Sequence, residues 1–455
     1  MTLAIAIFLA ASIIAIRGGR RGLRALVVLA IVLSPLRGGL LALADDLPIG
    51  DPDLAVNALV PVLVAAIALG CIVQKRPRLD DFPRPLTIAW ALIAVAAALS
   101  FLTSVVSLKL YGIGLAQYLV YPTFALAIWP LLEPGDPRRL SRLTIVMGFV
   151  VAITVLLQAA GVEGFIQAAS AQVDGLAADR FAGVTGSYLH TSAFLGIAAV
   201  LAMGEFANLS GWRERLGGTA VLAVILSGQV LTFSRSGVVI ATIGILALFL
   251  FAVRGARWRF AVLVVPALVI AVAVGSIGGV APDAAGARVT SGFNPKDDPG
   301  NKLRTESFEQ GFGTFGDGNL AEKAIGRGLA STGNARQLVD DGPQETVESY
   351  YLKLLVETGV IGLIMIGGFL IWAGVFFALG VWRPPSSWTA SIAAAGLGLS
   401  LYNVIYPALE TQILALTWWL LLALCLKIDR EKSVPLQPRS APRASAEPEM
   451  AASRG

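Results

Sequence analysis

The chain alternates between long apolar runs and short polar connections over most of its length. A membrane-spanning helix needs about 20 consecutive, mostly apolar residues, and a backbone in hydrocarbon must satisfy its N–H and C=O groups internally. The runs therefore predict about 12–13 transmembrane helices. In chain order the candidate spans are Thr2–Ile16, Ala25–Ala44, Ala55–Val73, Leu86–Val106, Gly112–Leu132, Leu143–Gly161, Ser187–Ala207, Gly217–Phe233, Gly237–Val253, Phe260–Val280, Leu352–Val381, Thr389–Tyr406 and Thr411–Leu426.

One long polar segment interrupts this pattern. Residues 281–351 carry eleven acidic and seven basic residues, so they must lie outside the lipid, and we expect a large, partly helical external loop. The chain then divides into 1–280 with ten spans, the loop 281–351, 352–426 with three spans, and the tail 427–455. From about residue 433 the tail is rich in Pro, Ala, Ser, Arg and Glu and lacks apolar residues, which predicts disorder.

Composition agrees with an all-α polytopic integral membrane protein. Apolar residues make up 56% of the chain and charged residues 14%, with a mean hydropathy of +0.74. The net charge of +5 is dispersed among short loops, so we expect no nucleic-acid partner. Cys71 and Cys425 both lie in apolar runs, and His190 is the single histidine. These counts predict no disulfide, no metal site and no cofactor.

Basic residues recur in alternate connections, and such residues stay in the cytoplasm. This alternation places the N-terminus and the 281–351 loop outside and the tail inside, whereas the acidic stretch Asp45–Asp53 falls among the external connections. The basic residues that follow the odd-numbered spans are Arg17, Arg20, Arg21, Arg24, Lys75, Arg76, Arg78, Arg84, Arg138, Arg139, Arg142, Arg213, Arg215, Arg254, Arg257, Arg259, Arg383, Lys427, Arg430 and Lys432.

Two arginines within the apolar regions are candidates for function, because an ionisable group in a span costs about 2.5–3.5 kcal/mol on insertion scales. Arg235 sits between two spans with almost no loop, at the predicted outer face. A guanidinium binds phosphate bidentately, so Arg235 is a candidate ligand for an anionic group. Arg37 lies inside the second span, where it either extends towards Asp45 and Asp46 or contacts substrate.

Further candidates lie near the external loop. Arg180 and His190 bracket the entry to the seventh span, although a lone histidine is more often a packed one. Arg288 and Arg304 are loop cations, and most charges in a solvated segment only face water. Glu348 and Glu357 stand where the loop becomes the eleventh span. There a carboxylate either complements the helix dipole or acts as a base towards a hydroxyl acceptor.

Four stretches together resemble the O-antigen ligase and Wzy-type polymerase superfamily of bacterial envelope polysaccharide assembly. Thr232–Gly237 is similar to the family's Ser-Arg-Ser turn, and Ala324–Leu329 to its Gly-x-Gly segment. Glu348–Leu363 resembles its loop-exit motif, His-Asn-x-Tyr-Leu followed by Glu-x-Gly-x-x-Gly, in which Tyr351 matches the tyrosine. Arg180–Ser192 resembles its Arg-x-x-Gly segment. The close resemblance covers about residues 180–372.

The resemblance implies a glycosyltransferase of the bacterial inner membrane that uses a polyprenyl (undecaprenyl) diphosphate-linked oligosaccharide as donor. It implies a glycan acceptor, and a chain-length regulator is a candidate partner. Arg235 and Glu348 would be catalytic, and Arg304, Arg288, Arg180, His190, Tyr351, Arg37 and Glu357 would bind substrate. Glu348 and Ser349 replace the motif's histidine and asparagine. This departure favours a polymerase of repeat units, of the exopolysaccharide or O-antigen type, or a ligase-like enzyme with a different acceptor. Ligase-like transfer of the glycan to lipid or protein is the alternative.

A transporter or lipid flippase, with the arginines along a translocation path, is the alternative of another class. Transporters usually place binding groups near the midplane on broken helices. Apart from Arg37, the candidate cations here cluster at the predicted outer face, which favours an enzyme.

Overall fold

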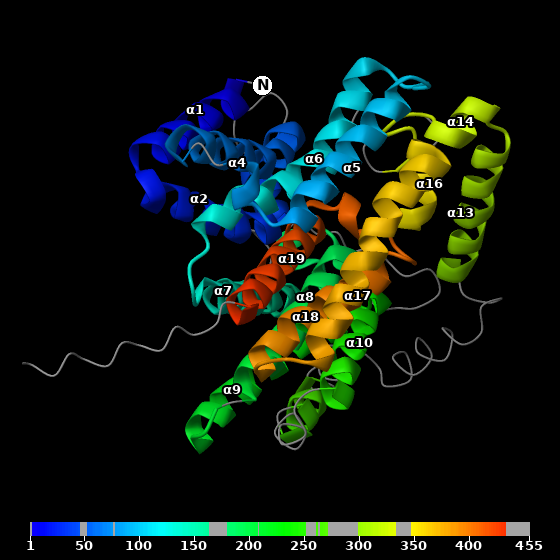
Figure 1. Cartoon of the computed structure of the whole chain (residues 1–455). Helices are drawn as coiled ribbons and strands as arrows, with labels where there is room; N and C mark the ends of the chain where they lie inside the picture. Colours follow the sequence, from blue (N-terminus) through cyan, green and yellow to red (C-terminus); the bar gives the residue numbers. More distant parts are fainter. Residues whose placement is uncertain are drawn as a thin grey trace, which may run out of the picture.

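The computed structural model of the chain is built from helices (Figure 1). It describes residues 2–45, 52–75, 78–162, 180–207, 209–251, 261–262, 264–271, 299–333 and 347–433, and no strand occurs in these ranges. The main helices are α1 (Thr2–Arg17), α2 (Gly19–Leu33), α3 (Arg37–Asp45), α4 (Pro52–Lys75), α5 (Arg84–Phe101), α6 (Leu108–Ile128), α7 (Asp136–Ala159), α8 (Tyr188–Phe206), α9 (Trp212–Leu231), α10 (Arg235–Phe251), α13 (Pro299–Gly316), α14 (Leu320–Ile325), α16 (Tyr350–Gly362), α17 (Gly368–Trp382), α18 (Ser387–Tyr402) and α19 (Gln412–Ser433).

The predicted fold class is confirmed. Within the described ranges, nine helical stretches are long and apolar enough to cross a membrane, and α1 and α10 contain shorter apolar helices. The protein is an all-α polytopic membrane protein. The tenth predicted span, Phe260–Val280, lies largely outside the described residues, as does the tail from residue 434.

Two of the predicted spans are not continuous α-helices. The second is interrupted by a 3₁₀ turn, Ser34–Leu36, which contains Pro35 and separates α2 from α3. Proline has no backbone N–H to donate and its ring crowds the preceding turn, so the break falls there. The eleventh span consists of α16, a π-helical turn at Leu363–Gly367, and α17.

The helices α8 and α19 form the centre of the bundle, and small residues on α8 let its neighbours approach closely. A Cβ added to Gly148 of α7 would lie 2.3 Å from Ala198 Cβ, and one added to Gly196 would lie 2.5 Å from the carbonyl oxygen of Gly237 on α10. A Cβ on Gly204 would similarly meet Ser391 of α18. Close backbone packing therefore fixes α7, α10 and α18 around α8.

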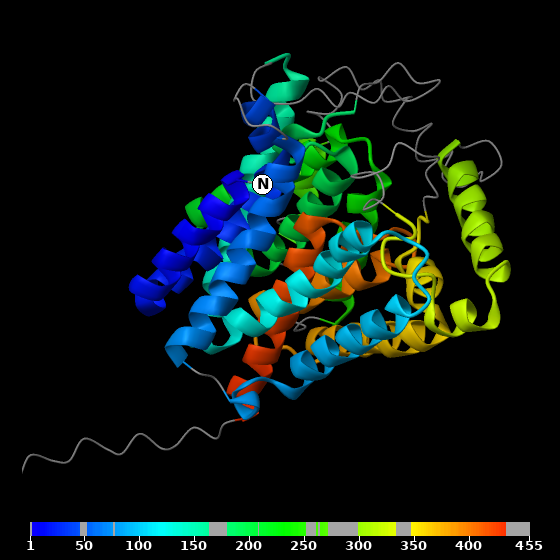
Figure 2. The ribbon, with the colours of Figure 1, turned by 90° about the horizontal axis from the view of Figure 1, so that it is seen from above.

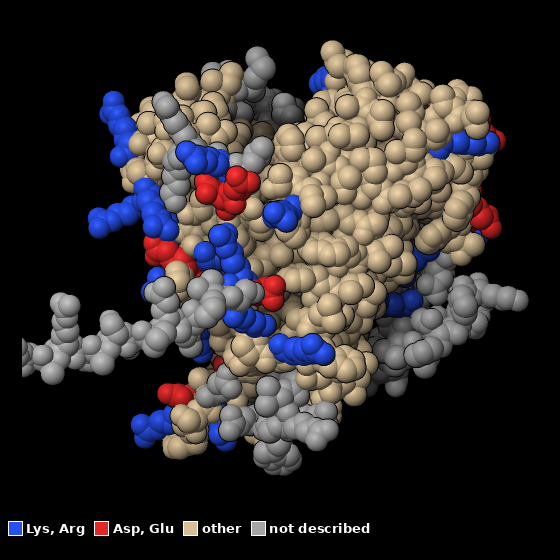
Figure 3. Space-filling view, in the orientation of Figure 1, with Lys and Arg blue, Asp and Glu red and all other residues tan. Residues whose placement is uncertain are grey.

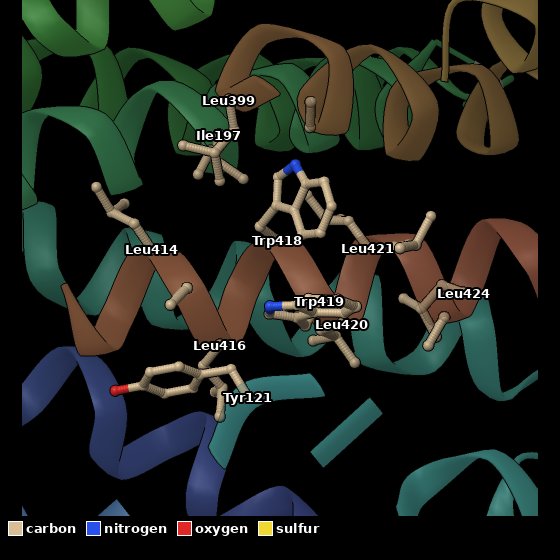
Figure 4. Close-up of a cluster of buried hydrophobic side chains, with 14 of the residues drawn as sticks. Tyr121, Ile197, Leu399, Leu414, Leu416, Trp418, Trp419, Leu420, Leu421 and Leu424 are labelled. Atoms are coloured by element: carbon tan, nitrogen blue, oxygen red, sulfur yellow. The ribbon is translucent and has the colours of Figure 1, made fainter. Parts of the chain in front are cut away.

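In contrast to α8, α19 packs through large side chains (Figure 4). Trp418 projects from it towards Ile197 of α8 and Leu399 of α18 (Figure 4), whereas Trp419 stacks on Phe369 of α17 with ring centres 5.8 Å apart. The Trp418 indole N–H donates to Ser400 Oγ at 2.9 Å, so this buried ring has its polar atom satisfied. An apolar core around α19 thus holds the surrounding helices together at the centre of the bundle.

One end of the bundle, here called the basic face, joins several of the basic connections. Arg20 pairs with Glu133 at 2.8 Å and Arg24 with Asp136 at 2.8 Å, which ties the start of α2 to the α6–α7 connection. The hydrogen bond from Arg24 lowers the pKa of the Glu133 carboxyl. Arg138 and Arg142 of α7 both bond Glu205 at the end of α8.

Figure 3 shows lysine and arginine side chains gathered where α2, α7, α9 and α19 lie in Figure 1. The surface over α5, α6, α16 and α17 carries few charges. The basic connections, which alternate with other connections along the chain, therefore lie together at the basic face of the folded protein.

The opposite end, here called the site face, joins the remaining connections. It comprises residues 101–108, 180–188, 231–235, 326–333, 347–350 and 402–412. In Figures 1 and 2, α13 and α14 stand at the edge of the bundle beside α16. Most of the candidate residues from the sequence lie at this end.

Candidate functional site

Glu348 lies at the entry to α16 and pairs with Arg304 of α13. The Arg304 Nε–H donates to Glu348 Oε2 at 3.1 Å, and both side chains are about one third exposed, at 34% and 33%. The backbone N–H of Glu348 donates to Ser307 Oγ at 2.7 Å, which fixes the carboxylate beside α13. Ser349 is the N-cap of α16 and accepts from the Leu352 N–H. The pair is therefore held in place and still open to a substrate.

Arg235 begins α10, and its position is set by α8. Ser192 Oγ donates to the carbonyl of Ser234 at 3.0 Å and accepts from the N–H of Gly237 at 3.0 Å. This hydroxyl clamps the turn between α9 and α10 from both sides. A tight turn at the site face is the result, with Arg235 at its centre.

Arg180 lies at the same corner of the molecule. The N–H of Phe181 bonds the carbonyl of Leu231, the last residue of α9. The Arg180 guanidinium lies 4.6 Å from the centre of the Tyr188 ring, a cation–π contact. The structure thus gathers Arg180 and Arg235 around the start of α8 and α10.

The end of α18 connects this corner to Glu348. A Cβ on Gly398 would lie 2.9 Å from the carbonyl of Ile240, so the last turns of α18 pack beside the first turns of α10. At that end the carbonyl of Asn403 accepts from the N–H of Tyr350, two residues after Glu348, at 3.1 Å. Arg235 and Glu348 therefore lie at the same end of the bundle, on either side of the end of α18.

A cavity of about 530 Å³ opens within the site-face half of the bundle. Two residues singled out in the sequence line it, Arg37 and His190. The Arg37 Nε–H donates to Asn57 Oδ1 at 2.6 Å, and His190 Nε2 lies 3.1 Å from the Tyr406 hydroxyl. The lining consists of Ser34, Arg37, Asn57, Ala58, Pro61, Ile113, Ala116, Gln117, Val120, Tyr121, Thr185, Ser187, His190, Tyr406, Glu410, Thr411, Gln412 and Ile413.

Arg235 does not line this cavity. Ser192 of α8 contacts the α10 turn, and His190 is two residues earlier. Residues two apart on a helix point to nearly opposite sides, so α8 separates the Arg235 turn from the cavity. The candidate residues fall into two groups that share one face of the membrane protein.

Glu357 does not line the cavity itself and lies behind its wall, in a fully buried network that reaches the cavity at Glu410. Lys353 Nζ lies 2.9 Å from Glu357 and 2.8 Å from Glu410, and all three side chains are at most 1% exposed. Tyr118 donates its hydroxyl proton to Glu357 Oε2 at 2.8 Å, and Thr332 donates to the other oxygen. This position favours a structural role for Glu357. Tyr351 is half-buried against the apolar core and does not line the cavity either.

The network holds residues 326–333 against a break in α16. Gly359 has a left-handed φ of +67° with ψ of −172°, so the helix is interrupted there. The carbonyls of Val356 and Glu357 accept instead from the N–H groups of Arg327 and Gly328, at 3.0 and 3.2 Å. Buried carbonyls need such partners. The Gly-x-Gly and Glu-x-Gly stretches of the sequence are therefore two halves of one packing unit.

Sequence reasoning missed several residues of this region, above all Tyr406, Glu410 and Lys353. The signal was present, because Tyr406 to Gln412 places polar residues in a short connection between two apolar runs. Lys353 is an ionisable residue inside a predicted span, which is a functional candidate by default. Arg288 lies outside the described residues.

Comparison with known families adds the deciding observation. Residues 218–367 match the model of the O-antigen ligase family. This match confirms the resemblance read from the sequence and indicates O-antigen ligase-like glycosyl transfer with lipid-linked polysaccharide substrates. No curated protein matches the chain.

The family match includes some of the candidate residues and excludes others. Arg235, Arg304 and Glu348 fall inside it, together with the 326–333 segment. Arg37, Arg180, His190 and Glu410 fall outside it. The cavity is thus lined by residues that the family match does not reach.

Proposed function

We propose that this protein is a polymerase that joins polyprenyl-diphosphate-linked oligosaccharide repeat units at the outer face of the bacterial inner membrane. The observation that carries the proposal is the O-antigen ligase match over residues 218–367, which spans Arg235, Arg304 and Glu348 at one end of the bundle. A donor with a lipid tail and a diphosphate head would reach this end from the membrane surface.

Arg235 is the proposed ligand of the diphosphate. Its turn is clamped by Ser192, so the cation is presented at a fixed height beside the starts of α8 and α10. As the glycan leaves, negative charge grows on the departing diphosphate. A preorganised cation at developing charge is often the largest catalytic contribution. Arg180, on the Tyr188 ring, supplies a second positive charge at this corner.

Glu348 is the proposed general base. The acceptor hydroxyl oxygen attacks the anomeric carbon of the donor, and its proton passes to the Glu348 carboxylate. The bond from the anomeric carbon to the diphosphate oxygen breaks, and polyprenyl diphosphate leaves with the electron pair. Arg304 orients the carboxylate through its 3.1 Å hydrogen bond, and a positioned base contributes about 10²–10⁴-fold.

The site face is the external face in this proposal. The basic face gathers Arg20, Arg24, Arg138 and Arg142, and basic connections remain in the cytoplasm. The transfer would then draw on a lipid-linked glycan outside the cytoplasm, where no nucleotide sugar is needed.

The test is a reaction with purified components. Full-length protein in detergent is incubated with lipid-diphosphate oligosaccharide that has been extracted from host cells lacking this protein. The length of the glycan is then measured. A polymerase yields a ladder of repeat multiples from this single lipid, without a membrane gradient. A ligase yields product only when a separate lipid or protein acceptor is added. A transporter yields no product longer than the starting oligosaccharide under either condition.

A pair of variants tests the assignment of Arg235. We expect Arg235→Gln to abolish the ladder, whereas Arg213→Gln, at the start of α9 on the basic face, leaves it unchanged. Equal ladders from wild type and Arg235→Gln would remove Arg235 from the mechanism.

A further inference from the structure

The cavity between α4, α6, α8 and the 403–411 connection has the size of a ligand site. Its volume of about 530 Å³ lies within the range of roughly 300–1,000 Å³ for small-molecule pockets. It lies beside the end of α18, which also contacts the Glu348 entry through Asn403 and Tyr350. A group bound in the cavity would therefore be close to the proposed base.

The lining combines polar side chains with apolar surface. Twelve of its eighteen residues have hydrogen-bonding side chains, although 56% of the chain is apolar. Sugar rings present hydroxyls on their edges and C–H groups on their faces, and the mixture of amides, hydroxyls and Tyr121, Tyr406 and His190 rings suits both.

Three lining residues have buried polar atoms with no hydrogen-bond partner among the described residues. They are the Ser34 hydroxyl, the Asn57 amide nitrogen and the Gln117 side-chain oxygen. Such atoms are normally satisfied, and leaving them without a partner is unfavourable. Asn57 already accepts from Arg37 through its oxygen, which orients its nitrogen as a donor. These residues of the wall thus carry a donor, an acceptor and a hydroxyl without a partner among the described residues.

Glu410 adds a carboxylate to the same wall. Lys353 Nζ donates to one oxygen of Glu410 at 2.8 Å, so the carboxylate is fixed in the cavity wall. A carboxylate is a strong acceptor for hydroxyl groups. Hydrogen-bonding side chains from four separate segments of the chain therefore line the cavity.

We propose that this cavity is a saccharide-binding site that holds sugar rings of the lipid-linked glycan, with Gln117, Asn57, Ser34 and Glu410 bonded to sugar hydroxyls. The inference rests on the proposed function, and it adds a glycan subsite formed by residues outside the 218–367 family match.

The experiment compares two lipids on full-length protein in lipid nanodiscs at 4 °C. One probe is the lipid-diphosphate oligosaccharide extracted from host cells that lack this protein, and the other is sugar-free polyprenyl diphosphate. The dissociation constant of the sugar-free lipid divided by that of the oligosaccharide lipid measures the contribution of the sugars to binding. We expect wild type to bind the oligosaccharide lipid more tightly than the sugar-free lipid.

Matched variants then locate that contribution. Gln117→Leu and Ser34→Ala should each lower the ratio about three- to tenfold, as for one lost hydrogen bond. Gln229→Leu and Ser12→Ala are the controls, since both residues are buried, have a side-chain atom without a partner among the described residues, and lie outside the cavity. The controls should leave the ratio unchanged.

Three results would overturn the inference: equal affinity of wild type for the two lipids, an unchanged ratio in both cavity variants, or an equal loss in the controls. The proposed function fails separately, when the wild-type protein at 30 °C forms no glycan that is longer than the starting oligosaccharide. The lipid ratio can be measured whether or not the protein polymerises, so the two failures are distinguishable.

Discussion

Gly326 and Gly359 pack backbone against backbone, which fixes residues 326–333 to the broken helix α16. A Cβ on Gly359 would lie 2.5 Å from Gly326 N, and a Cβ on Gly326 would lie 2.1 Å from the carbonyl oxygen of Glu357. Both glycines have left-handed φ angles, +89° and +67°. Only residues without a Cβ allow this approach at these angles.

Gly359→Ala should therefore destabilise the protein and lower its activity. The new Cβ would push residues 326–333 away from α16 and leave the Val356 and Glu357 carbonyls without their donors. Thermal unfolding in detergent would measure the effect. Gly374→Ala is the control, because its Cβ would meet only Ser400 at 3.9 Å, and alanine favours the helix by about 0.5–1 kcal/mol. Equal stability of the two variants would contradict the packing argument.

Lys353 is the shared cationic partner of two buried carboxylates, so its removal should be costly. Lys353→Met leaves Glu357 and Glu410 buried without their cation, and breaking such a pair costs about 3–5 kcal/mol. We expect a marked drop in the unfolding temperature. Adding Glu410→Gln should recover part of the loss, because one buried charge is then removed. Lys302→Met, on a side chain that is 75% exposed, should have little effect. A stable Lys353→Met protein would count against the buried network.

Glu348→Gln should reduce glycan formation about 10²–10⁴-fold, because the amide cannot accept the acceptor's proton. Stability should change little, since the Arg304–Glu348 pair is about one third exposed and exposed pairs contribute about 0–1 kcal/mol. Initial rates and unfolding temperatures together separate the two effects. Glu309→Gln, elsewhere on α13, is the control. A rate close to that of wild type would exclude Glu348 as the base.

Cysteine labelling should place the site face outside the cell. A cysteine at Gly318, between α13 and α14, should react with a membrane-impermeant maleimide in intact spheroplasts. A cysteine at Arg213, on the basic face, should react only after the membrane is permeabilised. Cys71 and Cys425 are buried and should give little background. The reverse labelling pattern would invert the orientation and remove the proposed donor.

The sequence alone determined the class of protein and most of its spans. Long apolar runs have no stable state in water, so their number and length predict a helical membrane protein whatever the details of packing. The alternation of basic connections likewise predicted which ends lie together, and the ion pairs of Arg20, Arg24 and Arg138 join those ends. The family motifs were also readable, because they are local.

Only the tertiary structure decided which polar groups meet. Arg37, His190 and Glu410 lie far apart in the chain and line one cavity, whereas Glu357, close to Glu348 in sequence, is turned into the core. Helix rotation and the break at Gly359 set these outcomes. They follow from close packing between helices distant in sequence, which hydropathy along the chain does not record.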